Sequence, residues 1–196
     1  MSKVITKFTR NVPHWQPRLT PVDLQEATEE QLAALQVTPS NTKVSDYLLT
    51  LAHDAESLTV RSPLFNAIMY DAGGMSRSER ELGALGASMV NHCIFCAAVH
   101  AMRHAQIEKS TEATDKLFRD GADADLDARD RAIFDFAVAL SKAPSEAGPD
   151  HVATLEAAGL DAAEMLDLVL SAALFGWANR LMHVLGDPVR QPETTT

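Results

Sequence analysis

Apolar residues recur every three or four positions through most of the chain from Thr42 onward, which is the spacing of one face of a helix. The segment 128–142, ARDRAIFDFAVALSK, shows this pattern clearly and follows Asp127, a residue type that favours the cap of a helix. No stretch alternates with the period of two that a half-buried strand requires. We therefore predict an all-α fold.

Capping-box patterns mark the start of two more helices. Ser76 is followed three residues later by Glu79, and Asp161 is followed in the same way by Glu164. The second of these helices, predicted over 162–185, is apolar on nearly all sides. A helix of this kind is typical of the centre of a domain.

Prolines set the first forty residues apart from the rest of the chain. Residues 1–40 contain four prolines and one short helical candidate near 23–35, so we expect an N-terminal arm there. A single helical domain is predicted over 41–190, and a disordered tail over 191–196.

The composition of the chain indicates which kinds of binding partner can be expected. A chain of 196 residues with 46% hydrophobic and 22% charged residues fits one globular domain. The formal net charge of −10 and a pI near 5.1 leave no basic surface for a phosphate backbone, so no nucleic acid is expected. The N-terminus lacks the apolar core of a signal peptide, and no uncharged apolar run reaches the roughly 20 residues that cross a bilayer. We expect a soluble, cytoplasmic protein without a membrane partner.

The segment 90–106, VNHCIFCAAVHAMRHAQ, holds both cysteines of the chain and three of its seven histidines. In a reducing compartment, a close cysteine pair is more often catalytic or metal-binding than a structural disulfide. The segment after the first cysteine lacks glycine and proline, so it is predicted to be helical. At about 100° per residue, one stripe of this helix carries Cys93, Cys96, His100 and His104.

A zinc site formed by this stripe alone is excluded by its length. Cys93 and His104 would lie roughly 16 Å apart along the helix axis, whereas the ligands of one zinc ion lie about 2.0 to 2.3 Å from it. Cys93, Cys96 and one histidine could bind a metal only if another element supplied the remaining ligands, and this stays open as the less favoured interpretation. We expect neither a metal nor a cofactor.

Redox chemistry fits these distances better. Two cysteines three residues apart on a helix have Cα atoms about 5 to 5.5 Å apart, which is within the range of a disulfide. His100 follows Cys96 by four residues, so its imidazole lies beside that sulfur and favours the thiolate. We therefore expect Cys96 to have the lower thiol pKa and Cys93 to be its disulfide partner.

A reactive thiol also needs an acceptor for its proton, and the nearest upstream candidates are Glu79 and Glu81. In one continuous helix Glu81 would lie roughly 18 Å from Cys93. We therefore expect the helix to break at Asn91, a residue type that tolerates the left-handed conformation, and Cys93 to begin the next helix. The helix dipole would further stabilise a thiolate there.

The order Glu81, Cys93, Cys96, His100, with eleven, two and three intervening residues, resembles the active-site pattern of AhpD-like alkylhydroperoxidases in the carboxymuconolactone decarboxylase superfamily. The resemblance covers roughly residues 43–187. The segments MSRSERELGALGASMVNHCIFCAAVHAMRH, LDARDRAIFDFAVALSKAP and FGWANRLMHVLG are similar to the branch of uncharacterised peroxidase-related proteins. The resemblance implies an AhpD-like helical bundle that assembles as a homo-oligomer, commonly a trimer or a hexamer.

The same resemblance implies an enzyme that reduces organic hydroperoxides. Cys96 would attack the peroxide, Cys93 would resolve the sulfenic acid, and Glu81 with His100 would shuttle protons. A partner thiol would then reduce the disulfide without a cofactor. The best-known family members carry a further relay histidine where this chain has Phe95. The decarboxylases of the superfamily lack the cysteine pair, so decarboxylation is disfavoured.

Other polar residues have a weaker link to this chemistry. His92 is a candidate replacement for the missing relay histidine. Asn179 and Arg180 lie near the end of the last predicted helix, where such groups bond terminal carbonyls, and a pocket-lining role is the second interpretation. Arg103 and His104 are interpreted as the polar edge of the cysteine helix.

The acidic run at 119–130, RDGADADLDARD, is interpreted as a solvated loop and helix start, because its spacing does not complete a calcium loop. A second function also stays open: a non-catalytic redox sensor or small-molecule-binding oligomer that uses the disulfide as a switch. Peroxide turnover with an added dithiol separates that function from a peroxidase.

Overall fold

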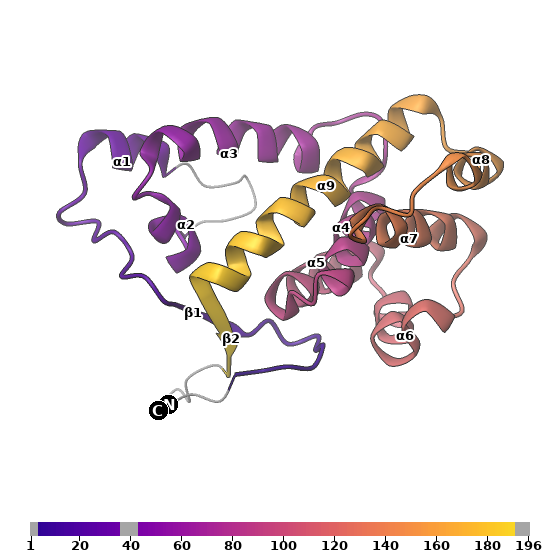
Figure 1. Cartoon of the computed structure of the whole chain (residues 1–196), viewed down its shortest axis with the longest axis horizontal. Helices are drawn as coiled ribbons and strands as arrows, with labels where there is room; N and C mark the ends of the chain where they lie inside the picture. Colours follow the sequence, from indigo (N-terminus) through magenta and orange to yellow (C-terminus); the bar gives the residue numbers. More distant parts are fainter. Residues whose placement is uncertain (1–3, 36–42, 191–196) are drawn as a thin grey trace.

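The computed structural model describes residues 4–35 and 43–190. These residues form a bundle of helices joined by short turns, with one small two-stranded sheet (Figure 1). The all-α prediction is confirmed. The predicted tail at 191–196 and the end of the predicted arm at 36–40 lie outside the described residues.

The centre of the bundle is helix α4 (Arg77–Val90), which packs mainly against α5 (Ile94–Glu108), α7 (Ala128–Ser141) and α9 (Ala162–Leu185). The capping boxes predicted at Ser76 and Asp161 are both formed, and the Asp127 side chain accepts a hydrogen bond from the backbone N–H of Asp130 at 2.9 Å.

Two glycines allow α4 to approach its neighbours closely. A Cβ atom at Gly83 would lie 2.7 Å from a methyl carbon of Leu168 on α9, and one at Gly86 would lie 3.1 Å from the Cβ of Ala137 on α7. A larger residue at Gly83 would force α4 and α9 apart, because packed interiors leave little free volume. The spacing GALG therefore fixes the distance between the helices that carry the site.

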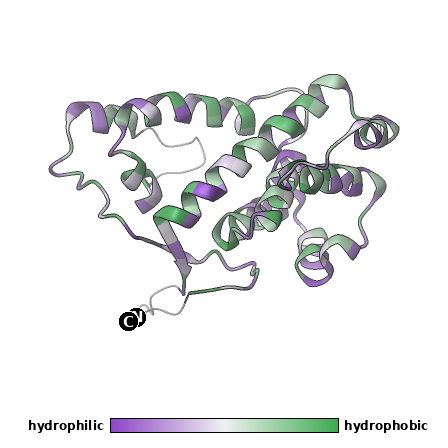
Figure 2. Cartoon of the chain, in the orientation of Figure 1, coloured by the Kyte–Doolittle hydropathy of each residue, from purple (hydrophilic) through white to green (hydrophobic). Residues whose placement is uncertain are grey.

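Helix α9 crosses the molecule diagonally, with α3 (Ala55–Tyr70) beside it (Figure 1). Hydrophobic residues cover most of α9, and hydrophilic ones interrupt its C-terminal half (Figure 2). Among the described residues, α9 is the one helix long and apolar enough to cross a membrane. Leu168, Ala172 and Asn179 are fully buried in the bundle, so core packing explains part of the apolar character that the sequence shows. Other large apolar residues of α9 are exposed, namely Leu166, Leu170, Trp177 and Val184.

The N-terminal region returns to the end of α9. Strand β1 (His14–Pro17) pairs antiparallel with β2 (Gly186–Val189), and Trp15 lies opposite Pro188. A Cβ atom at Gly186 would lie 2.3 Å from the Trp15 ring, so the indole packs directly on this glycine. The sequence did not predict this pairing, because four-residue strands that contain proline show no alternating pattern.

The remaining helices surround the central group. They are α1 (Glu29–Ala34), α2 (Asp46–Leu51), α6 (Glu112–Asp120), the short 3₁₀ turn η1 (Gly121–Asp123) and α8 (Pro149–Ala157).

Candidate active site

A tight turn between α4 and α5 positions the two cysteines. Asn91 ends α4 in a right-handed conformation with φ −76°, and the left-handed residue is His92, with φ 57°. The predicted break in the helix is therefore confirmed, but the prediction that Asn91 would be left-handed is wrong. Asn91 holds the turn through its side chain, whose Nδ2 donates to the Ala87 carbonyl at 2.9 Å. Cys93 is the N-cap of α5, as the sequence predicted.

Both cysteines are free thiols and almost fully buried. A hydrogen bond from the Cys96 thiol lowers the pKa of Cys93, with further bonds from the backbone N–H groups of Cys96 and Phe95 and from Asn179; burial opposes the shift. The same thiol–thiol bond raises the pKa of Cys96 well above its ordinary value, and burial adds to that increase. The predicted order of the two thiols is therefore wrong, because a helix N-terminus and a donated hydrogen bond stabilise the Cys93 thiolate.

His100 and Glu81 form a buried pair beside Cys96. His100 Nδ1 lies 2.5 Å from Glu81 Oε2, and the two side chains are 1% and 0% exposed. Arg77 donates from its Nε to the other carboxylate oxygen of Glu81 at 2.9 Å. The Nε2 atom of His100 is buried without a hydrogen-bond partner. When Nδ1 carries the proton and donates it to Glu81, Nε2 is left as a free base.

Burial sets the charge state of this pair. Burial lowers the pKa of His100, although Glu81 opposes the decrease, so the imidazole is neutral near pH 7. Burial would raise the pKa of Glu81, but the interactions with His100 and Arg77 outweigh it and leave the pKa below its ordinary value. The pair is thus an ionised carboxylate that orients a neutral imidazole, which suits proton transfer from a nearby thiol.

Cys96 and His100 open into one small cavity of about 120 Å³, which we call the thiol pocket. Its walls are mostly aromatic and aliphatic, with two arginines. The His100 ring stands edge-on to the Phe175 ring at a centroid distance of 4.0 Å. The other residues that line the thiol pocket are Ser45, Tyr47, Leu48, Arg61, Phe65, Phe95, Val99, Arg103, Ala178 and Met182.

Cys93 opens into a different cavity, of about 220 Å³, beneath the N-terminal region. We call this the arm pocket, because residues 4–6, Trp15 and Arg18 form part of its wall. The Trp15 indole N–H donates to the Met182 carbonyl at 3.4 Å and so attaches the arm to α9. The two sulfurs are therefore reached from two separate pockets.

The other predicted site residues, His92, Asn179 and Arg180, lie in different places. His92 is exposed, lines the arm pocket and contacts the Phe8 ring, so it lies on the Cys93 side. Asn179 is fully buried between the cysteines and α4, and its Nδ2 donates to Ser88 Oγ at 3.2 Å. Arg180 is exposed and donates to the Gly176 carbonyl within its own helix, not to a carbonyl at the helix end, and it lines neither the thiol pocket nor the arm pocket.

The interpretation of Arg103 and His104 as a polar edge is wrong. Arg103 lines the thiol pocket, and its guanidinium lies 4.0 Å from Glu81. His104 is 4% exposed and lines a third cavity. Sequence reasoning also missed Tyr47 and Arg61, which reach the thiol pocket from α2 and α3. A lone arginine within the apolar run of α3 was the available signal.

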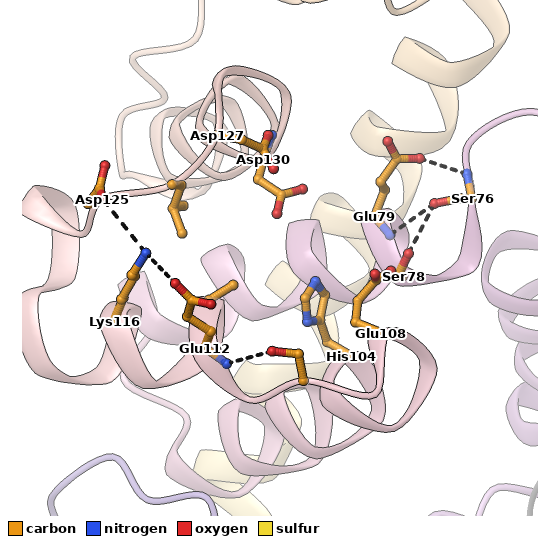
Figure 3. Close-up of a pocket in the computed structure, with 13 residues that line it drawn as sticks. Ser76, Ser78, Glu79, His104, Glu108, Glu112, Lys116, Asp125, Asp127 and Asp130 are labelled. Atoms are coloured by element: carbon orange, nitrogen blue, oxygen red, sulfur yellow. Dashed lines mark hydrogen bonds and ion pairs between the residues drawn. The ribbon is translucent and has the colours of Figure 1, made fainter.

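The third cavity, the acidic pocket, has a volume of about 570 Å³ and lies on the far side of α4 and α5. His104 rises from α5 among the side chains of Glu108, Glu112 and Asp130 (Figure 3). Three acidic residues of the run at 119–130, for which a solvated loop was expected, line this cavity. The carboxylates are Glu79, Glu108, Glu112, Asp125, Asp127 and Asp130.

No three histidine, cysteine or acidic side chains lie close enough to hold a metal ion in the part of the chain that the structure describes. The pair Cys93 and Cys96 therefore has no third ligand from another element. The absence of a metal requirement stays a prediction to be measured.

Comparison with known proteins finds one matching protein family and several solved structures with a similar fold. Residues 55–120 match the carboxymuconolactone decarboxylase family. A crystal structure of an AhpD-core, uncharacterised peroxidase-related protein from Ralstonia eutropha JMP134 is 26% identical, with a TM-score of 0.77 over 91% of this chain and 94% of that one. A comparison with curated proteins finds no match.

More distant structures share the fold. A peroxidase-related protein from Silicibacter sp. TM1040 is 22% identical, with a TM-score of 0.68 over 94% of this chain and 92% of that one. The debrominase Bmp8 is 16% identical, with a TM-score of 0.71 over 85% of this chain and 89% of that one. The matched segment contains Glu81, both cysteines and His100, and the bundle around them is shared along nearly the whole chain. This chain therefore matches the carboxymuconolactone decarboxylase family over residues 55–120, and along nearly its whole length its fold is similar to that of AhpD-like proteins.

Proposed function

We propose that this protein is a thiol-dependent peroxidase that reduces organic hydroperoxides through a cycle of Cys93 and Cys96. One observation carries the proposal: Cys96 and His100 open into the same buried pocket, and Glu81 holds the His100 ring with Nε2 unpartnered. A buried base beside a buried thiol is the arrangement that generates a thiolate on demand.

The first step is the attack of Cys96 on the peroxide. His100 Nε2 takes the thiol proton, and the Cys96 thiolate attacks the terminal oxygen of the hydroperoxide. The S–O bond forms, the O–O bond breaks, and the alcohol leaves after it receives a proton from His100. Because the pKa of Cys96 is raised, the base is needed for this step rather than merely helpful.

The second step returns the oxidised sulfur to a disulfide. The lowered pKa of Cys93 favours its thiolate, which attacks the sulfenic sulfur of Cys96. The S–S bond forms, the S–O bond of the sulfenic acid breaks, and the leaving hydroxide becomes water with a proton equivalent to the one that the Cys93 thiol released. An N-cap and the third residue of the same helix are close enough for this bond without large movement of the backbone. A dithiol then reduces the disulfide, and the arm pocket gives it access to Cys93.

We also propose that the protein is a homo-oligomer. Val60, Leu64 and Trp177 line one groove between α3 and α9 and are 67%, 54% and 45% exposed. A cluster of exposed large apolar side chains is typical of a protein interface. Light scattering coupled to size exclusion tests this, and a 21.3 kDa monomer at micromolar concentration would contradict it.

Steady-state consumption of an alkyl hydroperoxide with dithiothreitol as reductant tests the peroxidase. We expect turnover that continues beyond one equivalent and needs the dithiol. Disulfide formation without turnover would instead support the alternative, a redox sensor or small-molecule-binding oligomer.

A further inference from the structure

Arg61 differs from the other enclosed arginines of the described structure. Arg80 pairs with Asp167 at 2.8 Å, and Arg129 pairs with Glu79 and Glu164 at 2.5 and 2.7 Å. Arg61 forms no ion pair with a carboxylate of the described residues. Its guanidinium lies 4.4 Å from the centre of the Phe65 ring, and its Nε is buried without a hydrogen-bond partner.

The surroundings of Arg61 leave its charge uncompensated. Burial lowers the pKa of Arg61, and only the hydroxyls of Tyr47 and Tyr70 are found to oppose this among the described residues. An arginine keeps its proton even so, because its ordinary pKa lies far above neutrality. Arg61 is half-buried, and its Nε is buried. A cation in such surroundings without a counter-ion costs stability, and an anionic ligand would recover part of that cost.

The thiol pocket contains no acidic side chain among the residues that line it. The Tyr47 hydroxyl is buried without a hydrogen-bond partner and provides a second donor. The charge of Arg61 is not used on the thiol, since the pKa of Cys96 depends on Cys93, burial and Asn179. Two donors thus line the aromatic cavity that also contains Cys96 and His100, and Tyr47 packs close to the cysteines.

We propose that the thiol pocket binds an organic hydroperoxide that carries a carboxylate, held by Arg61 and the Tyr47 hydroxyl, with its peroxide directed to Cys96 and His100. The choice of a carboxylate follows from the planar guanidinium fork, which matches two carboxylate oxygens. The peroxide half of this inference rests on the proposed function, whereas the carboxylate half does not.

Binding of an unreactive pair of ligands tests the carboxylate half alone. Isovalerate and isovaleramide have nearly the same shape and differ in charge, and calorimetry at millimolar ligand measures both. We expect isovalerate to bind about tenfold more tightly than the amide, as a charge-assisted hydrogen bond provides. Arg61→Gln should remove this preference, and Arg61→Lys should restore part of it. Arg119→Gln, an exposed arginine paired with Asp120, is the matched control and should keep the preference.

Several results would overturn the inference. Equal binding of the acid and the amide to the natural protein would do so, and so would an unchanged preference in Arg61→Gln. A change of oligomeric state in Arg61→Gln, without loss of isovalerate binding, would show that Arg61 meets a carboxylate of a second copy instead.

Kinetics then connect the anion site to the reaction. We expect kcat/KM for β-hydroperoxyisovalerate to exceed that for tert-butyl hydroperoxide about tenfold in the natural protein, and Arg61→Gln should bring the ratio close to one. Turnover of both peroxides at equal rates would refute the inference and leave the peroxidase intact. Binding of isovalerate without turnover of either peroxide would refute the peroxidase and leave the anion site intact.

Discussion

The thiol pocket and the acidic pocket each contain one buried histidine of α5, and the two histidines are one turn apart. His100 is 1% exposed with Nε2 unpartnered, and His104 is 4% exposed with Nδ1 unpartnered. The two rings differ in what holds them. Glu81 fixes His100 through Nδ1, whereas His104 forms no hydrogen bond with a described carboxylate. Only His100 has a sulfur in its pocket.

The comparison shows that chemistry, and not volume, distinguishes a site. The acidic pocket is several times larger than the thiol pocket, but some of the carboxylates that line it repel one another. Burial raises the pKa of Asp130 to about 6, and Asp127, Glu108 and Glu79 add to the increase, while Arg129 opposes it. Glu81 orients a base at the thiol pocket, whereas in the acidic pocket neighbouring carboxylates disfavour the ionisation of Asp130. Other carboxylates of the acidic pocket are paired, Glu112 with Lys116 and Glu79 with Arg129.

The largest expected effect distinguishes the two cysteines. Cys96→Ser should abolish peroxide consumption, because it removes the thiol that shares a pocket with His100. Cys93→Ser should react once per site and then accumulate sulfenic or over-oxidised Cys96. Single-turnover peroxide consumption with a sulfenic-acid probe measures both. The reverse result, a first turnover kept by Cys96→Ser and lost by Cys93→Ser, would show that the low-pKa thiol is the nucleophile.

The two histidines provide the next test. His100→Ala should slow the first turnover by about 10²-fold, the usual contribution of a general base, and should shift its pH dependence upward toward the raised pKa of Cys96. His104→Ala, the matched control from the same helix, should change the rate by less than about twofold, because its ring faces no sulfur. Equal losses in both variants would indicate that the effect comes from damage to α5.

Substitution of Asp130 should have a smaller effect, and this effect is on stability. Its pKa is raised in the folded protein, so the unfolded chain ionises first and stability falls as the pH rises from about 4 to about 6. Asp130→Asn should therefore raise Tm above pH 6 by about 2 to 4 °C, allowing for solvent screening, and by almost nothing near pH 4.

Thermal melts at several pH values measure the Asp130 effect. Asp150→Asn, at an exposed position in the first turn of α8, is the control and should give no gain in Tm above pH 6. An increase in Tm of equal size at pH 4 and pH 7 would contradict the inference that the ionised Asp130 carboxylate destabilises the fold.

The smallest expected effect is that of a chelator. Neither pocket brings three metal-binding side chains together among the described residues. Peroxide turnover should therefore be unchanged by EDTA, and elemental analysis should find no stoichiometric transition metal. A metal that disappears in Cys93→Ser would support the metal site that the sequence left open.

The local features of this protein could be predicted from sequence because nearby residues determine them. Ser76, Asp127 and Asp161 cap their helices through side chains that bond N–H groups three residues away. The start of α5 at Cys93 and the position of His100 one turn beyond Cys96 follow from helix geometry. The spacing from Glu81 to His100 was similarly sufficient to indicate the family.

Tertiary structure decided the properties that depend on distant residues. The side of α5 that each histidine faces depends on the packing of α4 and α9, so the single stripe from Cys93 to His104 is divided among three pockets. The order of the thiol pKa values depends on the hydrogen bond between the two thiols, on burial and on backbone N–H groups at the N-terminus of α5. Arg61 reaches the thiol pocket only because α3 lies along α9. Sequence thus determined which residues could react, since helical spacing is local, and only the fold decided their surroundings, since burial and charge come from residues far apart in the chain.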